Sequence, residues 1–108
     1  AYIEQLEIAL AQIDKQFSPD LVLYVAGLDV HLADRLGKLA LSDKGIELRD
    51  KVVLNWASQR ELPVVAVMAG GYFPDLEHLT DLQLGVVERL AEYGQHYVNR
   101  VYLRKSSK

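Results

Sequence analysis

The sequence contains no cysteine, which excludes disulfides, thiolate metal sites and a cysteine nucleophile. It also lacks an apolar run long enough to cross a membrane, since the longest one, Leu21–Leu28, is far too short. Basic charge is not in excess: the net charge is −3 and the isoelectric point about 5.5, so no nucleic-acid partner is expected. A chain without cysteine suits a reducing compartment, and we expect a cytoplasmic protein with no membrane partner.

The N-terminus lacks the features of a signal peptide. Glu4 and Glu7 stand where such a peptide would carry basic residues. The chain opens at Ala1-Tyr2 without a methionine and already inside an amphipathic pattern. This start is typical of a truncated or processed protein.

Apolar residues at helical spacing predict three helices. The first runs from Ile3 to Phe17, and the second begins after an N-cap at Ser42. The third has Pro74 in its first turn and ends at Gly94 as a C-cap.

Two continuous apolar runs, 21–26 and 64–69, lie between these helices. Runs without alternation are typical of strands covered on both faces of a parallel sheet. The fold class is therefore α/β, with a three-layer arrangement of helices on both faces of a parallel sheet. Only two strands are clear in this chain, and two strands leave both sheet edges unpaired. We therefore expect either a missing N-terminal half or a homo-oligomer to complete the sheet.

The segment 96–103 fits a helix and a strand equally well. We accordingly divide the chain into an α/β portion, residues 1–95, and a C-terminal extension, residues 96–108.

Polar residues and glycines follow both predicted strands. Asp29 and His31 come after the first, and Gly70-Gly71-Tyr72 comes after the second. Ligands of open α/β sheets bind beyond the carboxyl ends of the strands, where adjacent parallel strands would bring these loops together. Each loop alone is also typical of an ordinary tight turn, so the residues themselves leave both interpretations open.

The order of several short motifs is more specific. Pro19-Asp20-Leu21 opens the first strand, Gly27-Leu28-Asp29 closes it, Asp34-Arg35-Leu36-Gly37 follows, and Gly70-Gly71-Tyr72 ends the second strand. This pattern resembles the histone deacetylase and acetylpolyamine amidohydrolase family, especially its bacterial, class IV-like members, up to about Tyr93. The resemblance implies part of an arginase/deacetylase-like fold. It also implies a zinc-dependent hydrolase of amide bonds, acting on acetyl-lysine or acetylpolyamine-type substrates.

The resemblance also implies roles for single residues. Asp29 matches a carboxylate zinc ligand, and zinc accepts such an oxygen at about 2.0–2.2 Å. Tyr72 matches the catalytic tyrosine that hydrogen-bonds the acetyl carbonyl and then the oxyanion. Gly70 and Gly71 match glycines that let the backbone pass close to the substrate channel. Asp34 matches a loop acid for which we expect a structural role.

The family's Asp-x-His ligand pair and His-His general base have no counterpart in this sequence. Its three histidines are His31, His78 and His96. His31 lies in the loop of Asp29, where we expect a loop residue and keep a metal ligand as the alternative. We expect His78 and His96 at the surface. A catalytic zinc takes three protein ligands, so we expect this chain alone neither to hold zinc nor to catalyse.

Three functions from different classes follow. The first is the C-terminal part of a zinc-dependent amidohydrolase, inactive as the isolated chain. The alternative is a stand-alone, non-catalytic, oligomeric α/β module derived from a deacetylase. A small ligand-binding protein that uses Asp29 and Tyr72 in a new way is a third.

Overall fold

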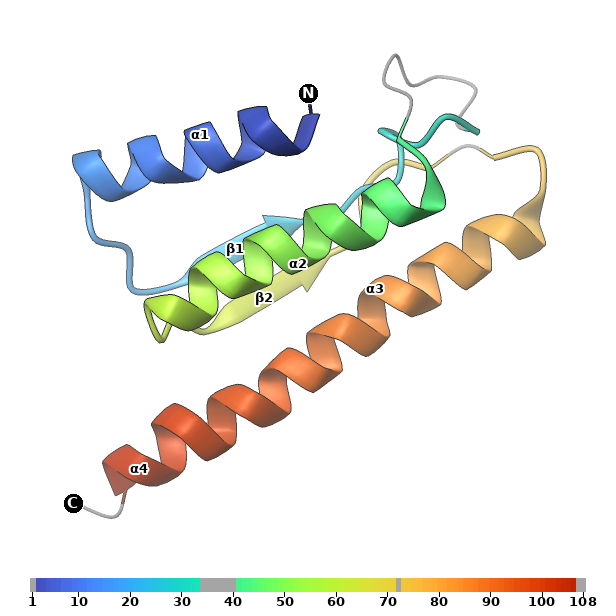
Figure 1. The fold of residues 1–108 in the computed structure, drawn as a ribbon. Helices are drawn as coiled ribbons and strands as arrows, with labels where there is room; N and C mark the ends of the chain where they lie inside the picture. Colours follow the sequence, from blue (N-terminus) through green and yellow to red (C-terminus); the bar gives the residue numbers. More distant parts are fainter. Residues whose placement is uncertain (1, 34–40, 72, 107–108) are drawn as a thin grey trace.

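Helices and strands alternate along the chain, as the sequence predicts (Figure 1). The computed structural model describes residues 2–33, 41–71 and 73–106. The elements are α1 (Tyr2–Gln16), β1 (Val22–Val25), α2 (Asp43–Gln59), β2 (Val64–Val67) and α3 (Leu76–Tyr97). A π-helical turn (Val98–Tyr102) and the short α4 (Leu103–Ser106) follow α3. The α/β fold class is confirmed.

The two strands pair in parallel and form one two-stranded sheet. Val22 lies opposite Val64, and Val25 lies opposite Val67. Both strands are shorter than the apolar runs that predict them, because the residues at the ends of each run belong to the flanking loops. The parallel pairing itself agrees with the sequence prediction.

Helix α2 lies across one face of this sheet, with α1 and α3 on its two sides (Figure 1). The burial of both strands alternates, so every second side chain faces away from the helices. Among the described residues, these outward apolar side chains are uncovered: Leu23 is 70% exposed, Val25 62%, Val65 49% and Val67 51%. Within the described residues, the sheet therefore has helices on one face and an exposed apolar face on the other, where the sequence predicts helices on both. The two-stranded parallel sheet itself agrees with the expected incomplete fold.

Side-chain caps begin α2 and α3. The hydroxyl of Ser42 accepts a hydrogen bond from the Gly45 amide at 3.1 Å, which confirms the predicted N-cap. The cap of α3 is Asp75, whose carboxylate accepts from the amides of Glu77 and His78. Pro74 thus precedes the cap and does not lie in the first turn, because Asp75 is the better acceptor for the free amides.

The predicted end of the third helix at Gly94 is wrong, since α3 continues to Tyr97 and the chain stays helical to Ser106. A glycine inside a helix costs only about 1 kcal/mol, which tertiary contacts can outweigh. Here Val101 is 3% exposed, and the Arg100 guanidinium donates to the Ser58 hydroxyl at 3.0 Å. The ambiguous segment 96–103 is therefore helical, while the domain boundary after residue 95 stays a prediction.

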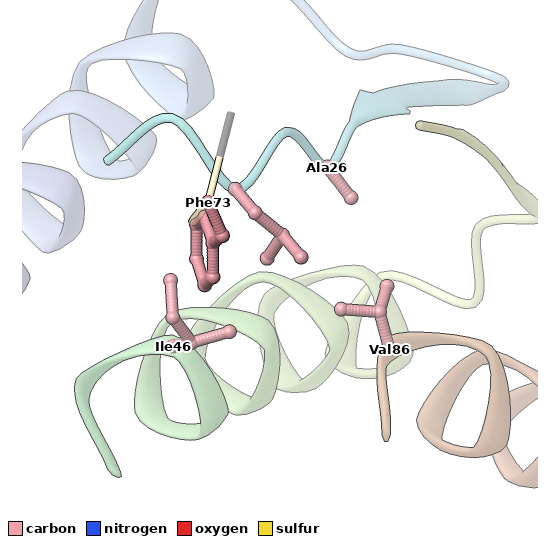
Figure 2. Packing of buried hydrophobic residues seen from close by; sticks show 5 residues of the cluster. Ala26, Ile46, Phe73 and Val86 are labelled. Carbon is pink, nitrogen blue, oxygen red and sulfur yellow. The ribbon is translucent and has the colours of Figure 1, made fainter. Parts of the chain in front are cut away.

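The buried core lies at the carboxyl end of the sheet, between the loops and the helices. Figure 2 shows Ala26, Ile46, Phe73 and Val86 converging there, and Leu28 completes the cluster. Two of these residues, Leu28 and Phe73, belong to the loops that follow β1 and β2. The core therefore anchors the loops that carry the candidate site. Within the described residues, no helix is long and apolar enough to cross a membrane.

Candidate functional site

The loops after β1 and β2 lie side by side, as the parallel pairing predicts. The Ala26 amide donates to the Val67 carbonyl at 2.8 Å, and the Leu28 amide reaches the Gly70 carbonyl at 3.5 Å. The ladder of the sheet therefore extends beyond the strands into both loops. Residues after β1 meet residues after β2 at one edge of the sheet.

Glycines make this close approach feasible. A Cβ atom at Gly27 would lie 1.9 Å from the Ala69 carbonyl oxygen, a distance that no side chain tolerates. Gly70 has φ +68°, and a Cβ there would lie 2.8 Å from the Cγ atom of Asp29. The Asp29 carboxyl group therefore lies directly against the Gly70 backbone.

Asp29 is exposed and borders a pocket of about 210 Å³ between α1, β1 and α2. Arg49 and Gly70 line the same pocket, and the Arg49 guanidinium donates to the Gly27 carbonyl. Asp29 joins no group of three potential metal-ligating side chains within the described ranges. Because a catalytic zinc takes three protein ligands, these residues alone do not fit the zinc site that the resemblance implies.

Two of the residues singled out by sequence, Tyr72 and Asp34, lie outside the described residues. Gly71 is described and has φ +134°, a conformation that favours glycine. The turn after β2 is therefore built on two consecutive glycines.

His31 lies in the loop after β1, as predicted, but its side chain is only 2% exposed. Its Nε2 atom is 2.7 Å from the Asp43 carboxylate, and its Nδ1 atom accepts from the Ala33 amide at 2.9 Å. Since Nδ1 is an acceptor, the neutral ring carries its proton on Nε2 and donates it to Asp43. The sequence does not show this contact, because Asp43 belongs to another element.

The sequence predicts His78 at the surface, but its side chain is only 33% exposed. Its Nε2 atom is 2.9 Å from the same Asp43 oxygen that His31 contacts. Its hydrogen bond is the main cause that holds the pKa of Asp43 below its usual range, and the bond with His31 adds to it. His96 is exposed, in agreement with prediction.

Sequence reasoning missed a buried ionic network beneath the site. Asp50 is fully buried and accepts from Arg49 on α2, from Arg89 on α3 and from the Tyr24 hydroxyl on β1. Burial and the bond to Asp50 raise the pKa of Tyr24. One signal was available: Asp50 lies four residues after Ile46 and three before Val53, on the apolar stripe of α2. A charge at such a position needs buried partners.

A known protein family matches most of this chain. A sequence profile of the histone deacetylase domain matches residues 1–89. The chain belongs to the histone deacetylase family. The match includes Asp29, Gly70, Gly71 and Tyr72, the residues by which the sequence resembles that family.

Similar proteins occur in a plant and in a bacterium. An uncharacterized protein of Picosynechococcus sp. is 40% identical over 72% of this chain, but this covers 26% of that protein. Histone deacetylase 2 of Arabidopsis thaliana is 39% identical over 66% of this chain and 18% of its own length. Histone deacetylase 18 of the same plant is 30% identical over 92% of this chain and 14% of its own length. The chain thus spans about a quarter or less of the length of each of these relatives.

Proposed function

We propose that the chain is the C-terminal part of a zinc-dependent amidohydrolase for acetyl-lysine or acetylpolyamine-type substrates, and that it is inactive by itself. The observation that carries this proposal is the position of Asp29 against Gly70, which stands two residues before Tyr72 in the sequence. The chain's small share of its relatives' length supports the inactivity, because the other ligands and the base would come from the remaining part. We also propose that the complete protein is a bacterial, cytoplasmic enzyme similar to class IV deacetylases.

Each site residue has a role in this proposal. Asp29 supplies one carboxylate ligand of the zinc, and Tyr72 donates a hydrogen bond to the acetyl carbonyl oxygen. Gly70 and Gly71 keep side chains away from the substrate, which their positive φ angles support. For Asp34 we propose a structural role, as the resemblance implies, and no part in the chemistry.

The test adds the upstream half of the protein. We expect no hydrolysis of an acetylated lysine peptide or an acetylpolyamine by the 108-residue chain, and hydrolysis by the chain joined to its upstream half. In that complete protein, Tyr72→Phe and Asp29→Asn should each lower kcat/KM by about 10²-fold or more, since removing one oxyanion donor alone costs about 10²–10³-fold. His96→Ala is the matched control, because His96 is exposed and distant in sequence from both loops. Hydrolysis by the isolated chain, or full activity of Asp29→Asn, would contradict the proposal.

The bare sheet face favours the second function, a non-catalytic oligomeric module. Its four apolar side chains, Leu23, Val25, Val65 and Val67, form a continuous exposed patch that a partner would cover. We expect the isolated chain to sediment as a dimer or higher oligomer and the double variant Leu23→Lys/Val65→Lys to sediment as a monomer. Leu84→Lys, the same kind of change at one 53% exposed position of α3, should leave the oligomer intact. A wild-type monomer at high concentration would exclude this second function.

A further inference from the structure

Three side chains from different elements meet at one point beside the core. His31 follows β1, Asp43 begins α2, and His78 lies in the first turn of α3. Both histidines direct Nε2 at the same Asp43 oxygen, at 2.7 Å and 2.9 Å. All three potential ligand atoms lie within 4.8 Å of one another. Two imidazole nitrogens and a carboxylate oxygen are donors that suit zinc and its neighbours in the first transition row.

The imidazole rings of His31 and His78 pack against the buried Phe73 ring. The Phe73 ring is 4% exposed and its centroid lies 5.0 Å from that of His31 and 5.4 Å from that of His78. The two histidine rings also contact each other edge to face, at 5.3 Å. The side chain of Asp43 is 62% exposed, so the cluster is closed on the core side and open to water on the other. An ion can therefore reach the two histidines from the solvent side, where the Asp43 carboxylate is exposed.

One side chain, that of Asp43, must move for the cluster to hold an ion. Zinc lies about 2.0–2.2 Å from nitrogen and oxygen ligands, so tetrahedral ligand atoms are about 3.3 Å apart. The two nitrogen–oxygen distances of 2.7 Å and 2.9 Å are the shorter ones of hydrogen bonds. Since both Nε2 atoms aim at the same Asp43 oxygen, that carboxylate must swing aside for an ion to take the place between them, and its exposed side chain leaves room to do so. Three protein ligands leave a fourth position for water.

We propose that His31, Asp43 and His78 form a metal site for a divalent transition ion, with zinc as the expected occupant. This site is separate from the Asp29 site, since Asp29 is not among the three grouped side chains. An ion there links the loop of Asp29 to the start of α2 and, through His78, to the start of α3. The proposal does not depend on the enzymatic function.

One contact must change when the ion binds. A metal on Nε2 of His31 displaces its proton, and the neutral ring then carries the proton on Nδ1. In the structure, the Ala33 amide donates to Nδ1 at 2.9 Å. This hydrogen bond is lost when Nδ1 carries the proton. The Ala33 amide then faces the Nδ1–H without an acceptor, which weakens binding by about 5–150-fold. The proposal requires that two histidine ligands and a carboxylate outweigh this cost. The change supplies a specific signature, a switch of His31 from the Nε2–H to the Nδ1–H tautomer.

The first test titrates the metal-free 108-residue chain with Zn²⁺ against a chromophoric chelator. We expect one ion per chain for the wild type, Asp29→Asn and His96→Ala. Affinity should fall at least tenfold in His78→Ala and in Asp43→Asn, because even residues behind the ligands of a metal contribute about 10–100-fold. Circular dichroism of each variant confirms that its helices remain. No bound zinc, or zinc retained by His78→Ala, overturns the proposal, and loss in Asp29→Asn alone would place the ion at the other site.

The second test observes the His31 ring by long-range ¹H–¹⁵N NMR correlation. Without metal, Nδ1 should be the unprotonated nitrogen, because it accepts from Ala33. One equivalent of Zn²⁺ should move the proton to Nδ1 and shift the Ala33 amide resonance. If zinc binds while His31 keeps its proton on Nε2, His31 is not a ligand and the proposed site is wrong.

Discussion

Asp50→Ala is expected to lower the free energy of unfolding by about 3–5 kcal/mol, the usual result of breaking a buried ion pair from one side. Asp50 is 0% exposed and accepts hydrogen bonds from Arg49 and Arg89. Without the carboxylate, Arg49 keeps its charge at 4% exposure and loses its ion pair with Asp50. The Tyr24 hydroxyl also loses its acceptor. Because domains are stable by only about 5–15 kcal/mol, this single change removes much of the total.

Urea unfolding followed by circular dichroism measures the effect. Asp50→Asn keeps the shape of the side chain but not its charge, so it should fall between the wild type and Asp50→Ala. Glu47→Ala is the control on the same helix: its ion pairs with Lys44 and Lys51 are on the surface, and their loss should hardly move the midpoint. An Asp50→Ala protein as stable as Glu47→Ala would contradict the prediction, because the buried network would then contribute little to stability.

The sequence predicts those parts of the fold that depend on neighbouring residues. The helical stripe of α2, the cap at Ser42 and the two apolar strands all arise from local spacing, and the structure confirms them. The meeting of Asp29 with Gly70 is also predictable, because parallel strands bring their carboxyl ends together. The helix end at Gly94 was mispredicted because the contacts of Arg100 and Val101 with distant residues keep the helix intact.

Contacts between distant charged residues were not predictable in the same way. Asp43 and His78 are 35 positions apart, and Asp50 and Arg89 are 39 apart. No periodicity relates the members of such pairs, because their meeting depends on how α3 crosses α2. The sequence shows only one member of such a pair, a charged residue at an apolar position of a helix, such as Asp50. The partner that neutralises this charge becomes identifiable only with the helix packing.

Gly27→Ala is expected to destabilise the chain by about 1–3 kcal/mol or more, as overpacking does in a buried site. Gly27 is buried, and a methyl group there would lie 1.9 Å from the Ala69 carbonyl oxygen and 3.1 Å from an Asp29 carboxylate oxygen. Because the first of these atoms is backbone, the loops after β1 and β2 must separate. The change should therefore also displace Asp29 from Gly70 and lower kcat/KM in the complete protein.

Gly94→Ala is the matched control for this prediction, since it adds the same methyl group elsewhere. Gly94 lies inside α3, and a Cβ atom there would meet nothing within 4 Å. Alanine loses less conformational freedom on folding than glycine, so this change should raise the free energy of unfolding by about 0.5–1 kcal/mol. Thermal unfolding of both variants should thus shift the midpoint in opposite directions. Equal midpoints would mean that the loops after β1 and β2 can move apart freely, and the close contact of Asp29 with Gly70 would then not be a fixed feature of the site.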